Sequence, residues 1–419
     1  MFSVNFRWLA IILWGRGLVL QYFWPGIVNY KMYGAARIRR FLPLIIIKNQ
    51  MKRFRIVLLF TAFCAISNLG ISQFRAYSNE FMNIGAGARG LGMGGAQVSS
   101  ATDATAGYWN PAGLSYIREV PTISAMHASY FSGIGKYDFL SAAIPLNDDK
   151  RTIGITAIRF GVDDIPNTLF LVDPQTGQLN YNNISAFSSA DYGFLLSYGQ
   201  LLKNTPDMQI SLGGNVKILY RHVGSFANAL GLGIDAGLMI RTPTWRIGVV
   251  ARDLTTTYNA WSFNFTDKEK EVLYLTNNDI PTKSTELTQP RLILGGGYNF
   301  VFNEKFSLLA ETNLDVTFDG KRNTLVSSDP ISIDPHLGIE GNIMDKVFIR
   351  AGISNFQRGL ADSDTTNQKR VWIFQPSLGA GFKLGNVVID YAFTNLANQS
   401  NPLYTHIFSL RVDLEKKKY

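Results

Sequence analysis

The chain has 419 residues, of which 46% are hydrophobic, 13% aromatic and 17% charged, and its formal net charge is +9. The charge is unevenly placed. Residues 1–72 hold ten Lys or Arg and no acid; subtracting these ten from 40 leaves 30 basic against 31 acidic residues. A near-neutral remainder gives no argument for nucleic-acid binding. The one cysteine, Cys64, also lies in this front section, so no disulfide or thiol chemistry is expected after it.

The front section reads as a leader rather than a domain. Residues 51–55 are basic, residues 56–69 are apolar, and residues 70–72 place small side chains at the −3 and −1 positions. This pattern predicts a signal peptide over 51–72, cleaved before Gln73. Residues 1–50 precede a complete signal that has its own methionine. We interpret them as a mis-annotated upstream extension, with an extra membrane-inserted leader as the alternative.

From about residue 122 to 414 the chain alternates apolar with polar or small residues. In residues 209–221, one face carries Ile210, Leu212, Gly214, Val216, Ile218 and Tyr220, and the other carries Ser211, Gly213, Asn215, Lys217, Leu219 and Arg221. A period of two predicts strands with an apolar and a polar side. The apolar side would face a core in a soluble sandwich. In an outer-membrane barrel it would face lipid.

The lengths of the connections favour the barrel. We predict 14 strands, starting near 121, 136, 151, 188, 206, 227, 244, 290, 304, 335, 345, 375, 386 and 402. Every second connection is short, whereas the others include long ones at 162–187, 255–289, 317–334 and 356–374. Short turns at one end and long loops at the other are typical of outer-membrane barrels. The sequence therefore predicts an all-β, antiparallel transmembrane barrel over 119–419, in contact with outer-membrane lipid.

Charges fall on the inward phase of many strands. The predicted polar network of the lumen comprises Lys217, Arg221, Asp235, Arg241, Arg246, Arg252, Arg291, Glu311, Glu340, Arg350 and Asp390. Unpaired charges are costly in a dry core, so a wet or plugged lumen is the natural place for both signs. A large soluble barrel with a polar interior is the alternative.

Residues 73–118 predict a plug inside the barrel. The segment is rich in glycine, which lets backbone pass close to other backbone. Its candidate residues are Gly85, Gly87, Arg89, Gly90, Gly92, Gly94, Gly95, Trp109, Asn110, Pro111 and Gly113. Three of the glycines match G-x-G-x-x-G, but no apolar strand precedes them, so a dinucleotide site is not expected. The alternative to a plug with a transport or partner role is a cap that only seals the barrel.

The plug also carries a family resemblance. Residues 87–96 read Gly-Ala-Arg-Gly-Leu-Gly-Met-Gly-Gly-Ala, and residues 104–114 read Ala-Thr-Ala-Gly-Tyr-Trp-Asn-Pro-Ala-Gly-Leu. These runs resemble the PorV/PorQ family of type IX secretion outer-membrane proteins, which is similar to the FadL fatty-acid transporters. The resemblance is sharp over 78–116 and architectural beyond. It implies a barrel that works beside the type IX translocon, where PorV-like members receive secreted cargo proteins.

Catalytic chemistry is not expected. Four histidines lie on separate predicted strands without metal-ligand spacing, and no nucleophile motif is present. Residues 362–367 begin like a calcium loop but lack its glycine and closing glutamate. No enzyme activity, metal or cofactor is therefore predicted. In the long loop 255–289, the exposed aromatics Trp261, Phe263 and Phe265 are candidate anchors for a partner, or they fold back over the mouth or belong to the aromatic girdle.

Three functions follow from these observations. The first is an accessory component of type IX secretion that binds cargo or translocon through loops and rim. The second is a FadL-like channel for hydrophobic small molecules, with a lateral opening at a kinked strand and an apolar pocket lined by Leu219, Met239, Ile293, Leu309 and Phe348. The third is a structural barrel without transport. The sequence does not determine the partner, the cargo or any movement of the plug.

Overall fold

The computed structural model describes residues 73–74, 78–146, 149–173, 176–280, 284–360, 370–394 and 404–415. The predicted upstream extension, 1–50, and signal peptide, 51–72, lie outside the described residues. Among the helices in the described part, none has the length and apolar character needed to cross a bilayer.

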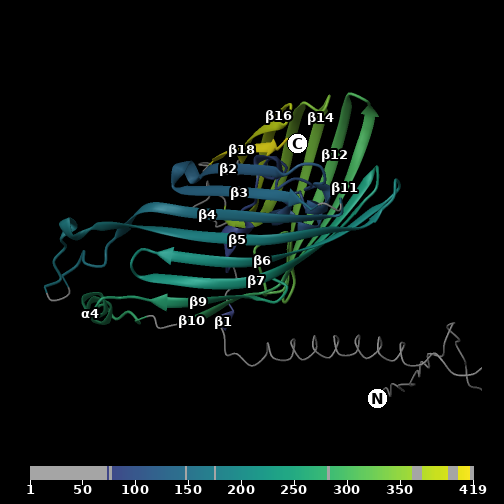
Figure 1. Cartoon of the computed structure of the whole chain (residues 1–419). Coiled ribbons are helices and arrows are strands. Elements are labelled where there is room, and N and C mark those ends of the chain that lie inside the picture. The colour runs from purple at the N-terminus through teal and green to yellow at the C-terminus, as the bar shows by residue number, and fades with distance from the viewer. Residues whose placement is uncertain are drawn as a thin grey trace, which may run out of the picture. The chain divides into compact units, whose positions relative to one another are not determined.

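The wall of the molecule is one antiparallel sheet that closes on itself (Figure 1). The ring closes where β18 pairs with β2, with Phe408 opposite His127. The first strands are β2 (Thr122–Tyr130), β3 (Gly135–Pro145), β4 (Arg151–Asn167), β5 (Ser185–Asn204), β6 (Gln209–Val223), β7 (Ala227–Arg241), β8 (Trp245–Arg252) and β9 (Thr257–Phe263). The remaining strands are β10 (Ser284–Thr288), β11 (Arg291–Asn303), β12 (Phe306–Thr317), β13 (Val326–Ser327), β14 (Ser332–Ile343), β15 (Val347–Leu360), β16 (Arg370–Leu384), β17 (Val387–Thr394) and β18 (Thr405–Asp413).

Two strands of the wall are interrupted halfway. β7 pairs with β8 along one half and with β9 along the other, so β8 and β9 are two parts of one strand. β11 pairs with β8 and β10 pairs with β9, so these also form one interrupted strand. The sheet has 18 strands, and β1 (Gln73–Phe74) and β13 have two residues each. Without these two, and with each interrupted pair counted once, the wall has the predicted 14 strands.

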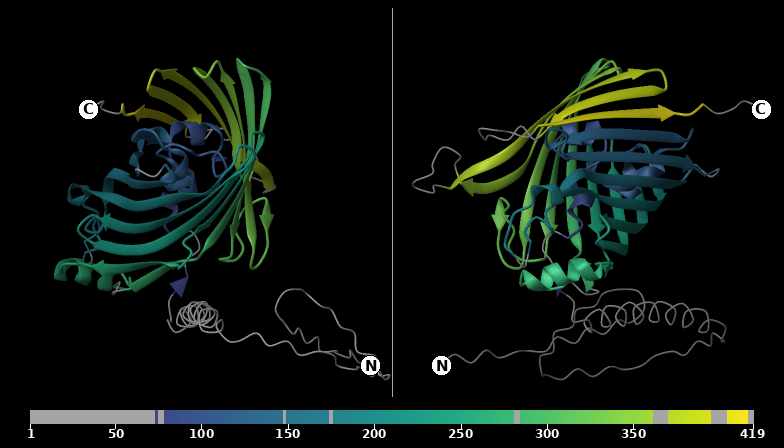
Figure 2. Two further views of the ribbon diagram at one scale, coloured as in Figure 1. Left: turned by 45° about the vertical axis from the view of Figure 1, so that its right-hand side comes forward. Right: turned by 90° about the vertical axis from the view of Figure 1, so that its left-hand side faces the viewer.

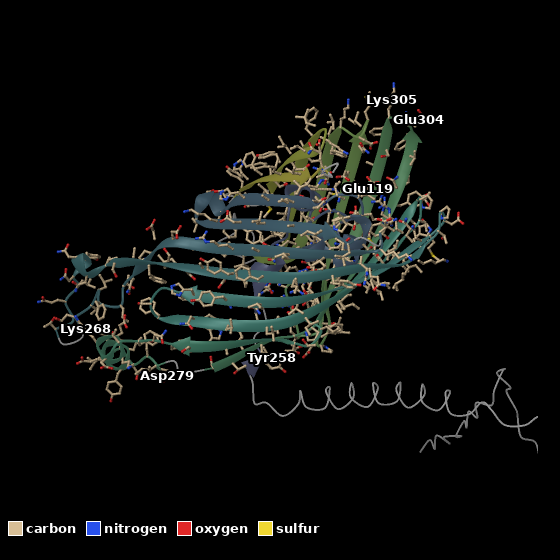
Figure 3. All side chains as sticks on the ribbon, in the orientation of Figure 1. Glu119, Tyr258, Lys268, Asp279, Glu304 and Lys305 are labelled. Carbon is tan, nitrogen blue, oxygen red and sulfur yellow. The ribbon has the colours of Figure 1, made fainter. Side chains whose placement is uncertain are left out.

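The connections sort by length as predicted. At one end, here the turn end, six short connections lie at 146–150, 205–208, 242–244, 304–305, 344–346 and 385–386. At the opposite loop end, long connections span 168–184, 264–283 and 318–331. Glu304 and Lys305 mark the turn end in Figure 3, and Lys268 and Asp279 mark the loop end. The predicted loop 356–374 is shorter, because β15 and β16 extend into it and only 361–369 lie outside the described residues.

The two faces of the wall differ in chemistry. Along β7, Leu230 and Leu232 are about three-fifths exposed on the outside, whereas Ala229 on the inside is buried. The same alternation of exposed apolar and buried side chains recurs on β2 to β6. Apolar side chains that point away from the interior all round a closed sheet require a lipid surrounding. The chain is therefore an outer-membrane β-barrel.

The segment before the wall fills the barrel interior (Figure 2). It begins at the loop end, where β1 pairs in parallel with β10, and it leaves at the turn end just before β2. Its short helices are η1 (Glu80–Asn83), α2 (Ala88–Gly92), α3 (Ala106–Trp109) and η2 (Pro111–Tyr116). Elsewhere the structure has η3 (Phe131–Gly133), η4 (Tyr181–Asn183) and α4 (Asp267–Leu275). We call residues 78–121 the plug.

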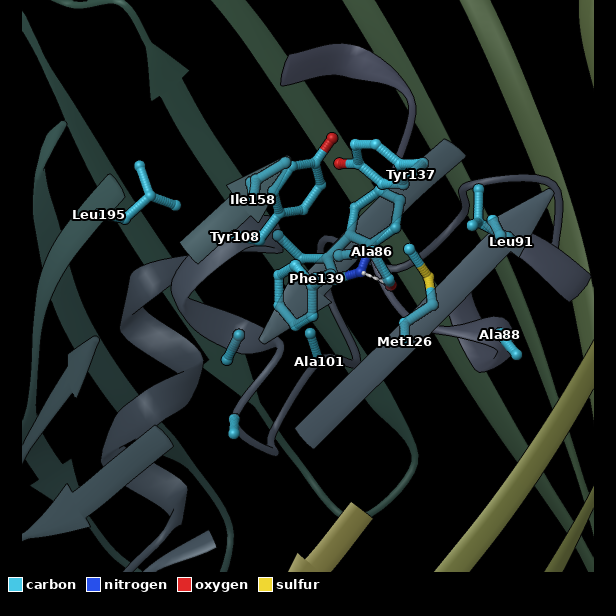
Figure 4. Close-up of a cluster of buried hydrophobic side chains, with 14 of the residues drawn as sticks. Ala86, Ala88, Leu91, Ala101, Tyr108, Met126, Tyr137, Phe139, Ile158 and Leu195 are labelled. Carbon is cyan, nitrogen blue, oxygen red and sulfur yellow. Dashed lines mark hydrogen bonds between the residues drawn. The ribbon is translucent and has the colours of Figure 1, made fainter. Parts of the chain in front are cut away.

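Part of the contact between plug and wall is a shared hydrophobic cluster. Tyr108 and Leu91 of the plug meet Tyr137, Phe139 and other wall side chains in one buried group (Figure 4). The rings of Tyr108 and Phe139 lie edge to face with centroids 6.3 Å apart. Such an arrangement adds to the free energy of burial. Plug and wall therefore share one core.

Elsewhere the plug touches the wall through backbone. Inward glycines occur on eight wall strands at the level of the plug, and they are Gly199, Gly213, Gly237, Gly248, Gly295, Gly338, Gly352 and Gly379. A Cβ atom at Gly199 would lie 2.7 Å from the Pro111 carbonyl oxygen, and one at Gly338 would lie 2.5 Å from the Met93 carbonyl oxygen. Because no side chain occupies these positions, the plug backbone can lie directly against the strands. We call this set the glycine belt.

The positions of the wall strands agree closely with prediction, whereas one predicted loop is partly ordered. Strand starts match within three residues except at two strands: β16 begins at Arg370 instead of 375, and the interrupted strand made of β10 and β11 begins at Ser284 instead of 290. The predicted loop 255–289 contains β9, α4 and β10. α4 begins with a capping box in which Thr266 and Glu269 satisfy each other's backbone N–H groups. Alternation is weak over 264–283. Before this stretch, β9 pairs with β7 and lengthens the wall into the predicted loop.

Substitution in the glycine belt tests the backbone contact. In Gly352→Ala, the new Cβ would overlap the backbone of Met93 and Gly94, whereas a Cβ at outward Gly296 meets nothing within 4 Å. We expect Gly352→Ala to lower the free energy of unfolding by about 1–3 kcal/mol. Gly296→Ala should stay within about 0.5 kcal/mol of the wild type. Denaturant unfolding measures both, and equal stability of the two variants would contradict the contact.

Protease treatment of intact cells tests which end faces outward. Trypsin should cut at Lys268 and Lys321 of the loop end, since both side chains are exposed. Lys203 and Lys305 are also exposed but lie at the turn end, so they should be cut only after the outer membrane is opened. Mass spectrometry of the released peptides distinguishes the sites. Cleavage at Lys305 in intact cells would reverse the orientation.

Candidate functional site: the plugged lumen and its cavity

A chain of alternating charges joins the plug to one side of the wall. The Arg89 guanidinium donates two hydrogen bonds of 2.8 Å to the Glu340 carboxylate. Arg350 donates to Glu340 at 2.6 Å and to Asp390 at 2.7 Å. The Arg350 side chain is 2% exposed, so both contacts are shielded from water. Two cations and two anions therefore alternate through the barrel interior, in a geometry that offsets the cost of their burial.

A second cluster lies beside the interrupted strand. The Lys217 ammonium, 2% exposed, contacts Asp235 at 2.8 Å and Asp253 at 2.5 Å. Asp253 follows directly after β8, and its φ of 56° turns the chain out of strand geometry. The Thr257 hydroxyl at the start of β9 donates to the same carboxylate. The interruption thus places the Asp253 carboxylate beside Lys217, a position that a continuous strand would not give it.

Two further arginines connect the wall with the plug. Arg252 donates to the carbonyl oxygens of Met82 at 3.4 Å and Tyr108 at 3.1 Å. Its guanidinium also lies 5.0 Å from the Tyr108 ring centroid. Arg221 pairs with Asp191 at 2.8 Å and lies over the rings of Trp261 and, in the plug, of Phe81. Both residues were predicted to face the lumen, and the structure places them there.

The predicted polar network is not paired throughout. Within the described part of the chain, Arg241 and Arg246 form no ion pair, and Arg241 lies 5.5 Å from the Tyr116 ring centroid. Glu311 has no cation partner among the described residues and instead accepts a 2.7 Å hydrogen bond from the Ser99 N–H. Arg291 contacts Glu80 and Asp315 at 3.6 Å each. The network is therefore a set of separate clusters.

The predicted plug motif has a structural role. Asn110 caps η2 through a 3.1 Å hydrogen bond from the Ala112 N–H to its side-chain oxygen, and its amide donates to the Val98 and Leu238 carbonyls. The Trp109 indole N–H donates to the Ala86 carbonyl at 2.8 Å. Pro111 and Gly113 lie in η2, and Gly92 lies against Gly379 of the wall. Positive φ is required at Gly85, Gly87, Gly94 and Gly95.

A cavity of about 550 Å³ lies between the plug and the loop end. Its floor is formed by the plug, with Ile84, Leu91 and Trp109 as apolar members. The wall contributes Tyr130 and Ile293 on the apolar side. The polar side carries Arg252, Arg291, Asp315, Arg322, Asp334 and His336. One space thus offers both an apolar surface and charged groups of both signs. Leu219, Met239, Leu309 and Phe348, predicted with Ile293 as a pocket lining, are absent from its described lining.

The loop 318–331 is tied down over this cavity. Arg322 hydrogen-bonds Asp319 of the same loop at 2.9 Å and reaches Glu80 of the plug at 3.2 Å. Burial acts to raise the pKa of the Asp319 carboxyl, but hydrogen bonds and charge from Arg322 outweigh it and hold that pKa below its ordinary value. Arg322 therefore joins the loop to η1 at neutral pH.

The candidate partner aromatics face the lumen at the loop end. Trp261 and Phe263 belong to β9, and their rings and that of Phe265 stack along it, with centroids 6.2 and 6.4 Å apart. The Trp261 N–H donates to Glu286 at 2.7 Å. With Leu169 and Phe226 they line a hollow of about 390 Å³. We call this surface the aromatic rim; Trp261 and Phe263 belong to a wall strand, so they are not part of the predicted loop.

Sequence reasoning missed several residues of the site. Asp191 and Asp253 supply the carboxylates for Arg221 and Lys217, and Asp103 pairs with Arg411 at 3.2 Å. Asp191 lies on the inward phase of β5 and was open to detection by the same alternation. Asp253 lies in the interruption, where period-two reasoning no longer applies. No described group of His, Cys, Asp or Glu side chains is arranged to hold a metal ion.

Comparisons with known proteins give structural neighbours only. No protein-family model matches the chain, and no curated protein matches it. The toluene transporter TbuX of Ralstonia pickettii is similar in structure, with 13% identity over 79% of this chain and 99% of that chain and a TM-score of 0.48. A Pseudomonas aeruginosa FadL homologue has 14% identity over 79% and 98%, also at 0.48. The toluene transporter TodX of Pseudomonas putida has 12% identity over 79% of this chain and 98% of that chain, with a TM-score of 0.48.

Removal of Arg350 tests the buried charge chain. Arg350→Ala would leave Asp390 without its 2.7 Å partner and Glu340 with Arg89 alone. Breaking a buried ion pair on one side costs about 3–5 kcal/mol, so the unfolding midpoint in denaturant should fall clearly. Lys305→Ala, at an exposed turn, serves as the control. An Arg350→Ala barrel as stable as this control would contradict a structural role of the chain of charges.

Proposed function

We propose that this outer-membrane barrel binds a small molecule, with an apolar body and a polar group, in the cavity above its plug. The single observation that carries the proposal is the cavity of about 550 Å³, which joins an apolar floor to a charged wall. Its size falls in the range of small-molecule sites, which combine apolar lining with a few placed polar groups. Trp109 and Leu91 would contact the apolar body. Arg291 and Asp315, with looser ion contacts than the other clusters, would meet the polar group.

The aromatic rim supplies an approach to this cavity. Its stacked rings line the inside of the loop end, and the described strands of the opposite wall are shorter, since β17 and β18 have 8 and 9 residues against 20 in β5. Exposed aromatic surface at a barrel mouth favours capture of apolar molecules from the outer side. A molecule that moves inward from the rim next meets Arg221 and Glu286, which lie beside Trp261.

The plug argues against an open pore. Its backbone lies against the glycine belt, and hydrogen bonds hold it to two strands of the wall, from Arg89 to Glu340 of β14 and from Arg252 of β8 to the Tyr108 carbonyl. Passage to the turn end would therefore require the plug to rearrange. Binding from the loop end requires no such change.

A second function, accessory to type IX secretion, is favoured by the plug sequence. Residues 87–96 and 104–114 resemble the PorV/PorQ family, and the same residues form the floor of the cavity and the cap of η2. In this case the aromatic rim would contact a secreted protein or the translocon instead of a small molecule. The two functions differ in what they require of the cavity.

Purification from native outer membranes in mild detergent tests the proposal. The wild type should carry a bound small molecule, detected by native mass spectrometry and identified after extraction. Ile84→Glu would place a charge on the apolar floor and should reduce its occupancy at least about tenfold, because burying an unpaired carboxylate is costly.

The matched control is Ile280→Glu, since Ile280 lies in the outer loop and does not line the cavity. Equal occupancy in Ile84→Glu and wild type would overturn the proposed site. Recovery of a large barrel or of secreted proteins, with an empty cavity, would favour the secretion function.

A further inference from the structure

Another hollow, of about 530 Å³, lies on the outer rim beside the lumenal cavity, with which it shares Arg322 and Asn323. It is formed where loop 318–331 meets the loop-end parts of β15 and β16. Its described lining is Lys321, Arg322, Asn323, Ser327, Arg358, Gly359, Leu360 and Arg370. Four of these residues are basic, and none of the described lining residues is acidic. We call it the basic pocket.

The basic pocket is held in shape by hydrogen bonds between its two sides. The Arg358 N–H donates to the Asn323 side-chain oxygen at 3.0 Å, and the Asn323 amide donates to the Arg358 carbonyl at 3.0 Å. The Ser327 hydroxyl donates to the Arg322 carbonyl. The Arg358 guanidinium lies 4.8 Å from the ring centroid of Trp372 on the adjacent strand. The loop and one of the cations are thus positioned before any ligand arrives.

Three of the four cations have no anionic partner among the described residues. Arg322 is neutralised by Asp319 and Glu80. No ion pair with a described residue is formed by Lys321, Arg358 or Arg370, and all three are exposed. Like charges gathered in one hollow repel one another unless an anion lies between them. An arginine fork and a lysine ammonium are the side chains that best bind phosphate oxygens.

The height of the basic pocket along the membrane normal indicates that a phosphate bound there would belong to a lipid. Arg358 lies 11 residues beyond Val347, the turn-end start of β15. At a rise of about 3.3 Å per residue and a tilt of about 35–45°, this is roughly 26–30 Å along the membrane normal. The lipid-facing apolar band of such barrels is about 25 Å tall. Outward Ile349, below the pocket, is 59% exposed, and Trp372 is 40% exposed beside Arg358, as in an interfacial aromatic girdle.

We infer that the basic pocket binds the phosphate group of a lipid headgroup in the outer leaflet. Lys321, Arg358 and Arg370 hold the phosphate oxygens, and Trp372 rests at the boundary with the acyl chains. These three cations do not line the lumenal cavity, and the inference stands independently of the proposed small-molecule function. It fixes the depth and rotation of the barrel in the membrane through one headgroup beside β15 and β16.

Reconstitution with defined lipids tests the inference. The full barrel is placed in phosphatidylcholine nanodiscs with increasing diphosphorylated lipid A, and retained lipid A per barrel is measured by native mass spectrometry. The combined variant Lys321→Gln, Arg358→Gln and Arg370→Gln should bind at least about tenfold more weakly, since each interfacial cation adds to anionic-lipid affinity. Lipid A without phosphates should bind the wild type as weakly.

The matched control removes three exposed lysines at the turn end, by Lys203→Gln, Lys305→Gln and Lys346→Gln, and should bind like the wild type. Circular dichroism confirms that all variants remain folded. Arg358→Lys, which keeps the charge, should retain more affinity than Arg358→Gln. Equal retention by the pocket variant and the wild type would overturn the site. Binding of soluble pyrophosphate by the wild type, with no preference for phosphorylated lipid A, would overturn the lipid as the source of the phosphate. The pocket would then be assigned to a soluble anion.

Discussion

The structure depends on direct backbone contact between the plug and the inner face of the barrel. Gly213 and Gly237 form a cross-strand pair on the wall, and a Cβ at either would meet Pro111 or Asn110 of the plug. Gly338 and Gly352 form another such pair, facing Met93 and Gly94. A strand with ordinary side chains would keep the plug at a distance and leave space in the interior. Because these positions are glycine, close packing of the interior is achieved with backbone.

Backbone contact alone leaves many polar groups to be satisfied, and the buried charges do this. Arg252 donates hydrogen bonds to the carbonyls of Met82 and Tyr108, which belong to the plug. Lys217 and Asp235 form a pair that would be costly alone, and Asp253 brings a second carboxylate from the interruption of the strand. The Asp253 N–H also donates to Asp235. The irregular backbone and the buried lysine therefore stabilise each other, since each supplies a partner that the other lacks.

Much of the wall was predictable, because two independent signals agree there. The period of two assigns faces, and the alternation of short and long connections assigns ends; Lys217, Arg252 and Arg350 were placed inside on this basis. The interruption at 253–256 was not predictable, since a four-residue irregularity leaves the alternation on either side intact. Trp261 and Phe263 were assigned to a loop because β9 is short. Only its pairing with β7 shows that it belongs to the wall. The glycine belt was visible as glycines, but its purpose depends on which plug residue lies opposite each one.

The binding surfaces lie at one end of the barrel because the two ends differ in the length of their connections. At the turn end the connections are too short to carry more than a tight turn, and the plug leaves the barrel there through η2, packed against Gly199 and Gly213. The cavity, the aromatic rim and the basic pocket all lie at the loop end, where β4 and β5 continue beyond the shorter strands. The plug forms the floor of the cavity with the residues that also seal the barrel. A ligand that moves this floor must therefore disturb Arg89 or Arg252, and with them the ion pairs and hydrogen bonds that hold wall and plug together. Ligand binding at the loop end is consequently coupled to the stability of the barrel. Any effect of that ligand on the turn end passes through the plug.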